Sequence, residues 1–100
     1  MEQLLSYNNV YKTVLNNQSI IIPPLTNSIT VMNIGVPLAM IDTVIPLNGG
    51  VPGTNNGEAI SFGGNRLEYF SGRLDIAFPG VGVGNVVIIF KIYLSSNNLK

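Results

Sequence analysis

The sequence has 100 residues, with five basic and five acidic side chains and no His, Cys or Trp. Charged residues make up 10% of it, against about 25% in a typical soluble domain, and a net charge of zero provides no electrostatic footprint for nucleic acid or an anionic membrane. Without Cys there is no disulfide framework, thiol nucleophile or thiolate metal site, and without His the commonest general base and metal ligand is missing.

The length predicts a single domain over residues 1–100. Residues 1–9 are expected to be a mobile arm, because short polar termini are usually mobile, and residues 95–100 a polar tail. The N-terminal segment carries an acidic residue, Glu2, directly after Met1 and lacks the apolar region of a secretory signal. The longest apolar run, residues 34–41, contains Gly35 and Pro37 and is far shorter than the about 20 residues of a spanning helix. We therefore expect no membrane partner.

The composition favours β-structure. The chain contains 12 Ile, 10 Val and 5 Thr, and 13 Asn, 11 Gly and 6 Pro interrupt them at short intervals. β-Branched residues favour strands, whereas Asn, Gly and Pro favour turns. No window of the sequence shows a clean helical stripe, so an all-β domain is predicted.

The first half of the chain contains four expected strands. The second one ends at Pro23-Pro24, which cannot donate to a ladder, and the fourth carries Asp42 near its middle. A long loop, residues 47–57, follows and contains two Asn-Gly pairs that suit turns with positive φ. The four strands cover residues 10–15, 19–22, 28–34 and 38–46.

The second half contains four more expected strands, of which the seventh alternates clearly between apolar and charged residues. They cover residues 58–62, 67–70, 73–78 and 86–94. Short strands separated by turn signals every 8–12 residues or so indicate a two-layer antiparallel β-sandwich of about eight strands. Both a jelly roll and an immunoglobulin-like Greek key fit this pattern.

The last strand is apolar on both faces. One face carries Val86, Ile88, Phe90, Ile92 and Leu94, and the other carries Val87, Ile89, Lys91 and Tyr93. In a two-layer sandwich only one face of a strand meets the core, and an exposed Val or Ile forgoes roughly 1.5–3 kcal/mol of burial. The segment 38–46 has the same pattern.

These doubly apolar strands predict a contact between subunits, since interface cores are poor in charge. The residues that we place at this contact are Val87, Ile89, Tyr93 and Ile41. The alternative is that loops, the N-terminal arm or a strand that crosses between the sheets covers them within one chain.

No motif in the sequence predicts catalysis or a cofactor. The glycine-rich segment 80–84 lacks the spacing of a phosphate loop and leads into a strand rather than a helix. The serines have no His to activate them, and nothing forces two of the carboxylates to face each other. Asp42 is expected to point to solvent or to cap a bulge. We expect no enzyme, no cofactor and no metal ion.

The aromatic residues indicate a second possible function. Tyr69 and Phe70 lie beside Arg66, and together they suit stacking on a sugar ring with polar hydrogen bonds around it. This reading predicts an extracellular carbohydrate-binding or adhesion module, with Arg66, Tyr69 and Phe70 as its binding residues.

Four segments carry a resemblance to a known group of proteins. The alternation of residues in these segments resembles that of small β-sandwich proteins attached to bacteriophage heads, such as decoration and head-fibre proteins. The segments are residues 28–35, 57–63, 72–78 and 86–94, and the resemblance covers about two-thirds of the chain. It implies a non-enzymatic homo-oligomer, commonly a trimer, that binds the capsid lattice. It carries no functional residue over to this sequence.

We therefore expect a structural protein of the virion. It is expected to bind a phage capsid or tail as an oligomeric decoration, fibre or minor capsid component, with no nucleic-acid partner. A virion protein released by cell lysis needs no secretory signal.

Overall fold

A computed structural model describes residues 6–51, 57–65, 68–80 and 83–94. The ordered secondary structure in these ranges consists of strands, and none of the described residues forms a helix able to cross a membrane. The strands are β1 (Tyr7–Val14), β2 (Gln18–Ile21), β3 (Thr26–Asn33), β4 (Ala39–Ile41), β5 (Ile45–Leu47), β6 (Ala59–Gly63), β7 (Arg73–Ala77) and β8 (Val86–Tyr93).

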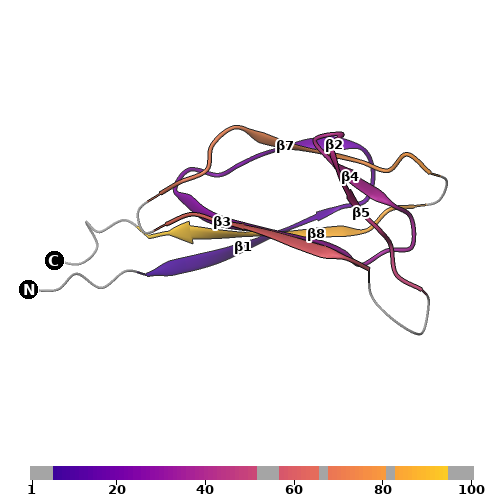
Figure 1. The fold of residues 1–100 in the computed structure, drawn as a ribbon. Coiled ribbons are helices and arrows are strands. Elements are labelled where there is room, and N and C mark those ends of the chain that lie inside the picture. The colour runs from indigo at the N-terminus through magenta and orange to yellow at the C-terminus, as the bar shows by residue number, and fades with distance from the viewer. Residues whose placement is uncertain (1–5, 52–56, 66–67, 81–82, 95–100) are drawn as a thin grey trace, which may run out of the picture.

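Two four-stranded antiparallel sheets pack face to face (Figure 1). Sheet A has the strand order β1-β8-β3-β6, and sheet B has the order β2-β7-β4-β5. The first strand and the last strand are neighbours in sheet A, so the described N-terminal and C-terminal ends lie at the same end of the molecule. The predicted all-β sandwich is confirmed.

The strand pairing distinguishes between the two sandwich topologies. β1 pairs with β8, β2 with β7, β3 with β6, and β4 with β5. This is the pairing of a hairpin folded in half and wound into two sheets, which is a jelly roll. An immunoglobulin-like domain distributes its strands differently between its sheets, so the Greek key of that type is excluded.

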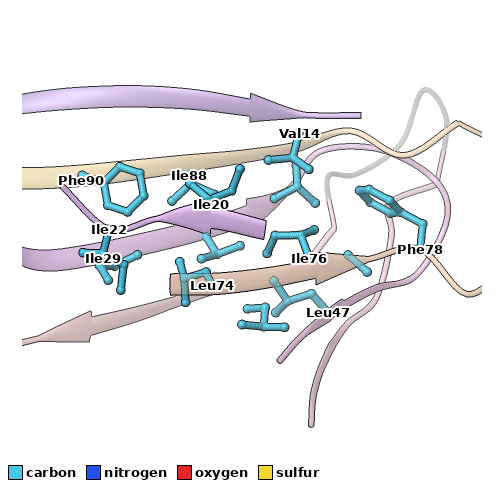
Figure 2. Close-up of a cluster of buried hydrophobic side chains, with 14 residues drawn as sticks. Val14, Ile20, Ile22, Ile29, Leu47, Leu74, Ile76, Phe78, Ile88 and Phe90 are labelled. Carbon is cyan, nitrogen blue, oxygen red and sulfur yellow. The ribbon is translucent and has the colours of Figure 1, made fainter. Parts of the chain in front are cut away.

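The core fills the space between the inner faces of the two sheets (Figure 2). Sheet A contributes Val14, Ile88 and Phe90, which face Ile20 and Ile76 of sheet B. In β3, β7 and β8 the buried residues recur at every second position, as a half-buried strand requires. The alternation of β7, with Leu74 and Ile76 inside, follows the prediction.

The expected fourth strand is wrong in one respect, because residues 38–46 form a hairpin rather than one strand. β4 and β5 pair with each other, and Asp42 and Thr43 form the turn with φ values of 53° and 59°. Val44 donates a backbone hydrogen bond to Ile41 across this turn, which gives it the geometry of a type I′ turn. Asp42 is exposed, as expected, and its Oδ1 also accepts the N–H of Asp75 at 2.9 Å.

Two further expectations need correction. Residues 7–9 belong to β1 rather than to an arm, because Tyr7 and Asn9 pair with Tyr93 and Lys91 of β8. Phe70 lies in no strand and makes only an isolated bridge to Thr26. Residues 1–5 and 95–100, and also residue 67 of the expected sixth strand, lie outside the described residues.

Asn33 at the end of β3 organises the loops at one end of the sandwich. Its buried amide donates to the carbonyl oxygens of Pro37 at 2.8 Å and Leu47 at 2.9 Å, and its Oδ1 accepts the N–H of Gly35 at 3.0 Å. Buried polar groups need such partners. One side chain thus fixes the connections on either side of the β4–β5 hairpin.

Candidate interaction surface

The outer face of sheet A is the side turned away from the core. Side chains alternate between the faces of a strand, and the buried residues Val86, Ile88 and Phe90 place the core on one side of β8. The intervening positions and their partners in the ladder form the outer face. Its residues are Tyr7, Asn9, Tyr11, Thr13, Val87, Ile89, Lys91, Tyr93, Ser28, Thr30, Met32, Ala59, Ser61 and Gly63.

Val87 and Ile89 occupy the centre of this face because β8 is an inner strand of sheet A. Ile89 lies between Tyr11 and Thr30, and Val87 lies between Thr13 and Met32, so each is half-buried by its neighbours within the sheet. Among the described residues, no third layer of strands lies over this face (Figure 1). Both side chains therefore point outward, as the alternation of the sequence predicts.

Charge is scarce on the outer face. Among its residues only Lys91 is ionised, and the Nζ of Lys91 lies 4.2 Å from the centre of the Tyr7 ring. Thr30 and Ser61 satisfy each other through a hydroxyl–hydroxyl hydrogen bond of 3.0 Å. The two hydroxyls therefore lose little when another surface covers them, whereas the ammonium group of Lys91 has to keep its contact with water, because burying an unpaired charge is costly.

Tyr93 does not belong to the accessible part of this face. Its side chain is only 4% exposed, because Tyr7 lies 4.6 Å away and Tyr69 makes an edge contact at 5.8 Å, both measured between ring centres. The prediction of Tyr93 as a contact with another subunit is therefore wrong for this side chain. Residues far apart in the sequence cover it within the same chain.

Ile41 is also misplaced by the sequence prediction. The side chain is 1% exposed and belongs to the core. β4 ends directly after Ile41, and its inward positions are Ala39 and Ile41, whereas Met40 points outward and is half-buried. Ile41 therefore packs in the core between the two sheets and is not available for a contact with another subunit.

The segment after β6 forms a shallow depression at the end of sheet A. The Asn27 side chain holds this segment by donating to the carbonyl oxygens of Asn65 at 3.0 Å and Glu68 at 2.9 Å. The backbone N–H of Phe70 donates to Thr26 at 2.8 Å. The depression has a volume of about 370 Å³ and is lined by Gly63, Gly64, Glu68, Tyr69 and Phe70.

Two of the three predicted sugar-binding residues meet at this depression. Tyr69 is 46% exposed there and Phe70 is half-buried. Arg66 lies outside the described residues. The sequence analysis missed Glu68, whose Oε1 accepts the N–H of Asn65 at 2.7 Å, and no pattern in the sequence singles it out.

Comparisons with protein-family models, curated proteins and solved structures found no match. Within the described residues, no three acidic, His or Cys side chains gather closely enough to hold a metal ion.

Proposed function

We propose that this chain is a non-enzymatic structural protein of a virus particle, which acts as an oligomer through the outer face of sheet A. In this role it decorates or forms part of a phage capsid, tail or fibre. The position of Val87 and Ile89 at the centre of an uncovered sheet face carries the proposal. Val87 and Ile89, together with the neighbouring Met32 and Tyr11, form an apolar centre within a face of mixed polarity, and an apolar cluster rimmed by polar residues is typical of sites of protein association.

The fold and the charge distribution support the same role. Jelly rolls recur in viral capsid proteins and also in lectins, although a fold alone does not assign a function. The outer face has a single charged residue, Lys91, and interface cores are depleted in charged residues. The assignment to a virus particle rests in addition on the resemblance of four segments to phage-head proteins. The neighbouring genes test it, because we expect them to encode capsid, portal or tail proteins.

Substitution of Ile89 by Asp tests the proposed contact. The carboxylate replaces an apolar side chain that contributes roughly 1.5–3 kcal/mol when buried, so we expect a smaller species that keeps the β-sheet circular dichroism of the parent. Light scattering behind a sizing column measures the mass. Val44→Asp is the matched control, because Val44 is 74% exposed at the β4–β5 turn of sheet B, outside sheet A and its edge strand β1. An oligomer that survives Ile89→Asp unchanged contradicts the proposed face.

The depression at Tyr69 favours a second candidate function, carbohydrate binding. An exposed aromatic ring beside the carboxylate of Glu68 and the open backbone of Gly63 offers a stacking surface and hydrogen-bonding groups to a neutral sugar. A protein that binds carbohydrate in this way would act as an adhesion module outside the cell or on the virion surface.

A glycan array tests this second candidate. We expect that Tyr69→Ala abolishes any signal, whereas Tyr11→Ala, which removes an exposed tyrosine of strand β1, leaves it unchanged. Equal loss in both variants assigns the binding to the sheet face rather than to the depression, and an array without signal for the parent protein contradicts the candidate.

A further inference from the structure

The four outermost strands of the two sheets differ in how well their edges are protected. β2, β5 and β6 have four, three and five residues, and β5 contains Pro46. Short length and proline are common protections against pairing with another chain. β1 has eight residues without Pro or Gly, and six consecutive positions of it are exposed. β1 is therefore the long, unprotected edge of the sandwich.

The register of β1 against β8 shows which backbone groups face this edge. Leu94 donates to the carbonyl oxygen of Ser6, and the pairing continues in step from Tyr7 opposite Tyr93. In an antiparallel ladder every second residue bonds to the partner strand, and the others turn their N–H and C=O groups away. The even-numbered residues of β1 thus bond to β8. The residues with outward groups are Tyr7, Asn9, Tyr11 and Thr13.

We propose that β1 pairs in antiparallel fashion with β1 of a second copy of this chain, about a two-fold axis at Val10. Tyr7 then lies opposite Thr13, and Asn9 lies opposite Tyr11. All four outward residues take part, and each pair exchanges two backbone hydrogen bonds. The two copies of sheet A then form one continuous sheet. This pairing extends the proposed structural role, because it gives the oligomer a second contact, at the edge of sheet A, besides the contact at its outer face.

The sequence of β1 is complementary to itself in this register. Lys12 lies opposite Asn8 of the second copy, so the one charge of the strand meets a polar neutral residue. A pairing centred on Lys12 places the two lysines opposite each other, which is unfavourable. A pairing centred on Tyr11 leaves Tyr7 without a partner. The register centred on Val10 is the one that uses every outward group without opposing like charges.

The space beside β1 adds apolar contact to the backbone pairing. A cleft of about 270 Å³ opens between the edges of the two sheets. Its apolar lining includes Val10 of β1, Ile20, Ile21 and Phe90, and its polar lining includes Lys12, Gln18 and Ser19. In the proposed register the second Val10 lies directly opposite the first, on the same side of the sheet as this cleft. Pairing therefore covers apolar side chains that the single chain leaves partly open to water.

Charge variants of Asn8 test the register. Asn8 is exposed, so its substitution leaves the core of the single chain intact. Asn8→Glu places a carboxylate opposite Lys12 twice in each dimer, and Asn8→Lys places an ammonium group there. Sedimentation equilibrium at low salt is expected to give a dimer that is about three- to tenfold tighter for Asn8→Glu and weaker by a similar factor for Asn8→Lys. Equal affinities of both variants overturn the register.

Proline and amide exchange test the edge itself. Asn9→Pro removes an outward N–H that β8 does not use, and we expect the dimer to weaken by about tenfold or more. Ala59→Pro is the matched control on the β6 edge, since Asn33 pairs with Glu58 and thereby turns the N–H of Ala59 outward. In the dimer, hydrogen exchange at Asn9 and Tyr11 is expected to be slow.

The same amides separate this inference from the contact proposed at Ile89. Slow exchange at Asn9 and Tyr11 that persists in Ile89→Asp supports the edge pairing, whatever that variant does to larger assemblies. Fast exchange at both amides at every protein concentration overturns the edge pairing, even where Ile89→Asp dissociates an oligomer.

Discussion

The ring of Tyr7 in β1 lies 4.6 Å from the ring of Tyr93 in β8, with an angle of 37° between the ring planes. The two residues are direct partners in the ladder. Tyr7 thereby covers one side of Tyr93 and carries the ammonium group of Lys91 on its own ring. The start of the first strand and the end of the last strand are joined by side chains as well as by the backbone.

This relationship predicts that Tyr7→Ala destabilises the fold. The variant loses an aromatic pair, worth about 0.5–1.5 kcal/mol, and an exposed cation–π contact, worth about 0.5–1 kcal/mol. We expect the free energy of unfolding in urea to fall by about 1–2.5 kcal/mol. Tyr11→Ala is the control on the same strand, because Tyr11 is 64% exposed. A smaller loss for Tyr7→Ala than for Tyr11→Ala contradicts the role given to the tyrosine pair.

Alternation of apolar residues was sufficient to predict the layers of the fold and the centre of the candidate surface. Residues 86–94 were expected as a strand, and β8 covers Val86–Tyr93. Since side chains on a strand alternate regardless of what it pairs with, Val87 and Ile89 could be placed on one face from the sequence alone.

The sequence predictions are wrong where contacts between residues far apart in the chain determine the burial of a side chain or the position of a turn. Nothing local shows that Tyr7 and Tyr69 cover Tyr93, because they come from the opposite end of the chain and from a loop. The turn at Asp42 was missed because the surrounding residues form one apolar run and neither Asp42 nor Thr43 is a glycine. Hydrogen bonds between Asp42 and the backbone of Asp75 hold that turn against β7, and a propensity scale cannot contain them.

The same turn predicts a stabilising substitution. Thr43 has a φ of 59°, a left-handed conformation that costs about 1–2 kcal/mol for most residues and is more tolerable for Asn. We expect Thr43→Asn to raise the free energy of unfolding by about 0.5–1 kcal/mol, measured as a higher urea midpoint. Thr13→Asn, in the extended strand β1, is expected to lower it instead, because Asn is disfavoured in strands. Destabilisation by Thr43→Asn argues against strain at this turn.

Asn33 is expected to be among the least replaceable polar residues. Its side chain is 1% exposed and bonds to Pro37, Leu47 and Gly35, so Asn33→Ala leaves buried backbone groups without partners. Each such group costs about 1–3 kcal/mol, and we expect a total loss of about 2–5 kcal/mol in urea unfolding. Asn16→Ala, at an exposed position, is the control. An equal effect of the two substitutions shows that water replaces the Asn33 side chain.

Gly84 lies where a side chain has no room. A methyl group added at Gly84 comes within 2.2–2.4 Å of three ring carbons of Phe78, and Phe78 belongs to the core. Forcing an extra methyl group into a packed site costs about 1–3 kcal/mol, which is the loss of unfolding free energy expected for Gly84→Ala. Gly80→Ala is the matched control, because a methyl group there meets nothing within 4 Å.

A double-mutant cycle identifies the cause of the Gly84 effect. Phe78→Leu shortens the ring that meets the new methyl group, so the double variant Gly84→Ala with Phe78→Leu is expected to lose less stability than the two single losses combined. Residues in contact show such coupling, whereas distant ones are additive within about 0.3–0.5 kcal/mol. Additive losses in urea unfolding place the Gly84 methyl group away from the Phe78 ring and trace the destabilisation to the backbone of the loop that leads into β8.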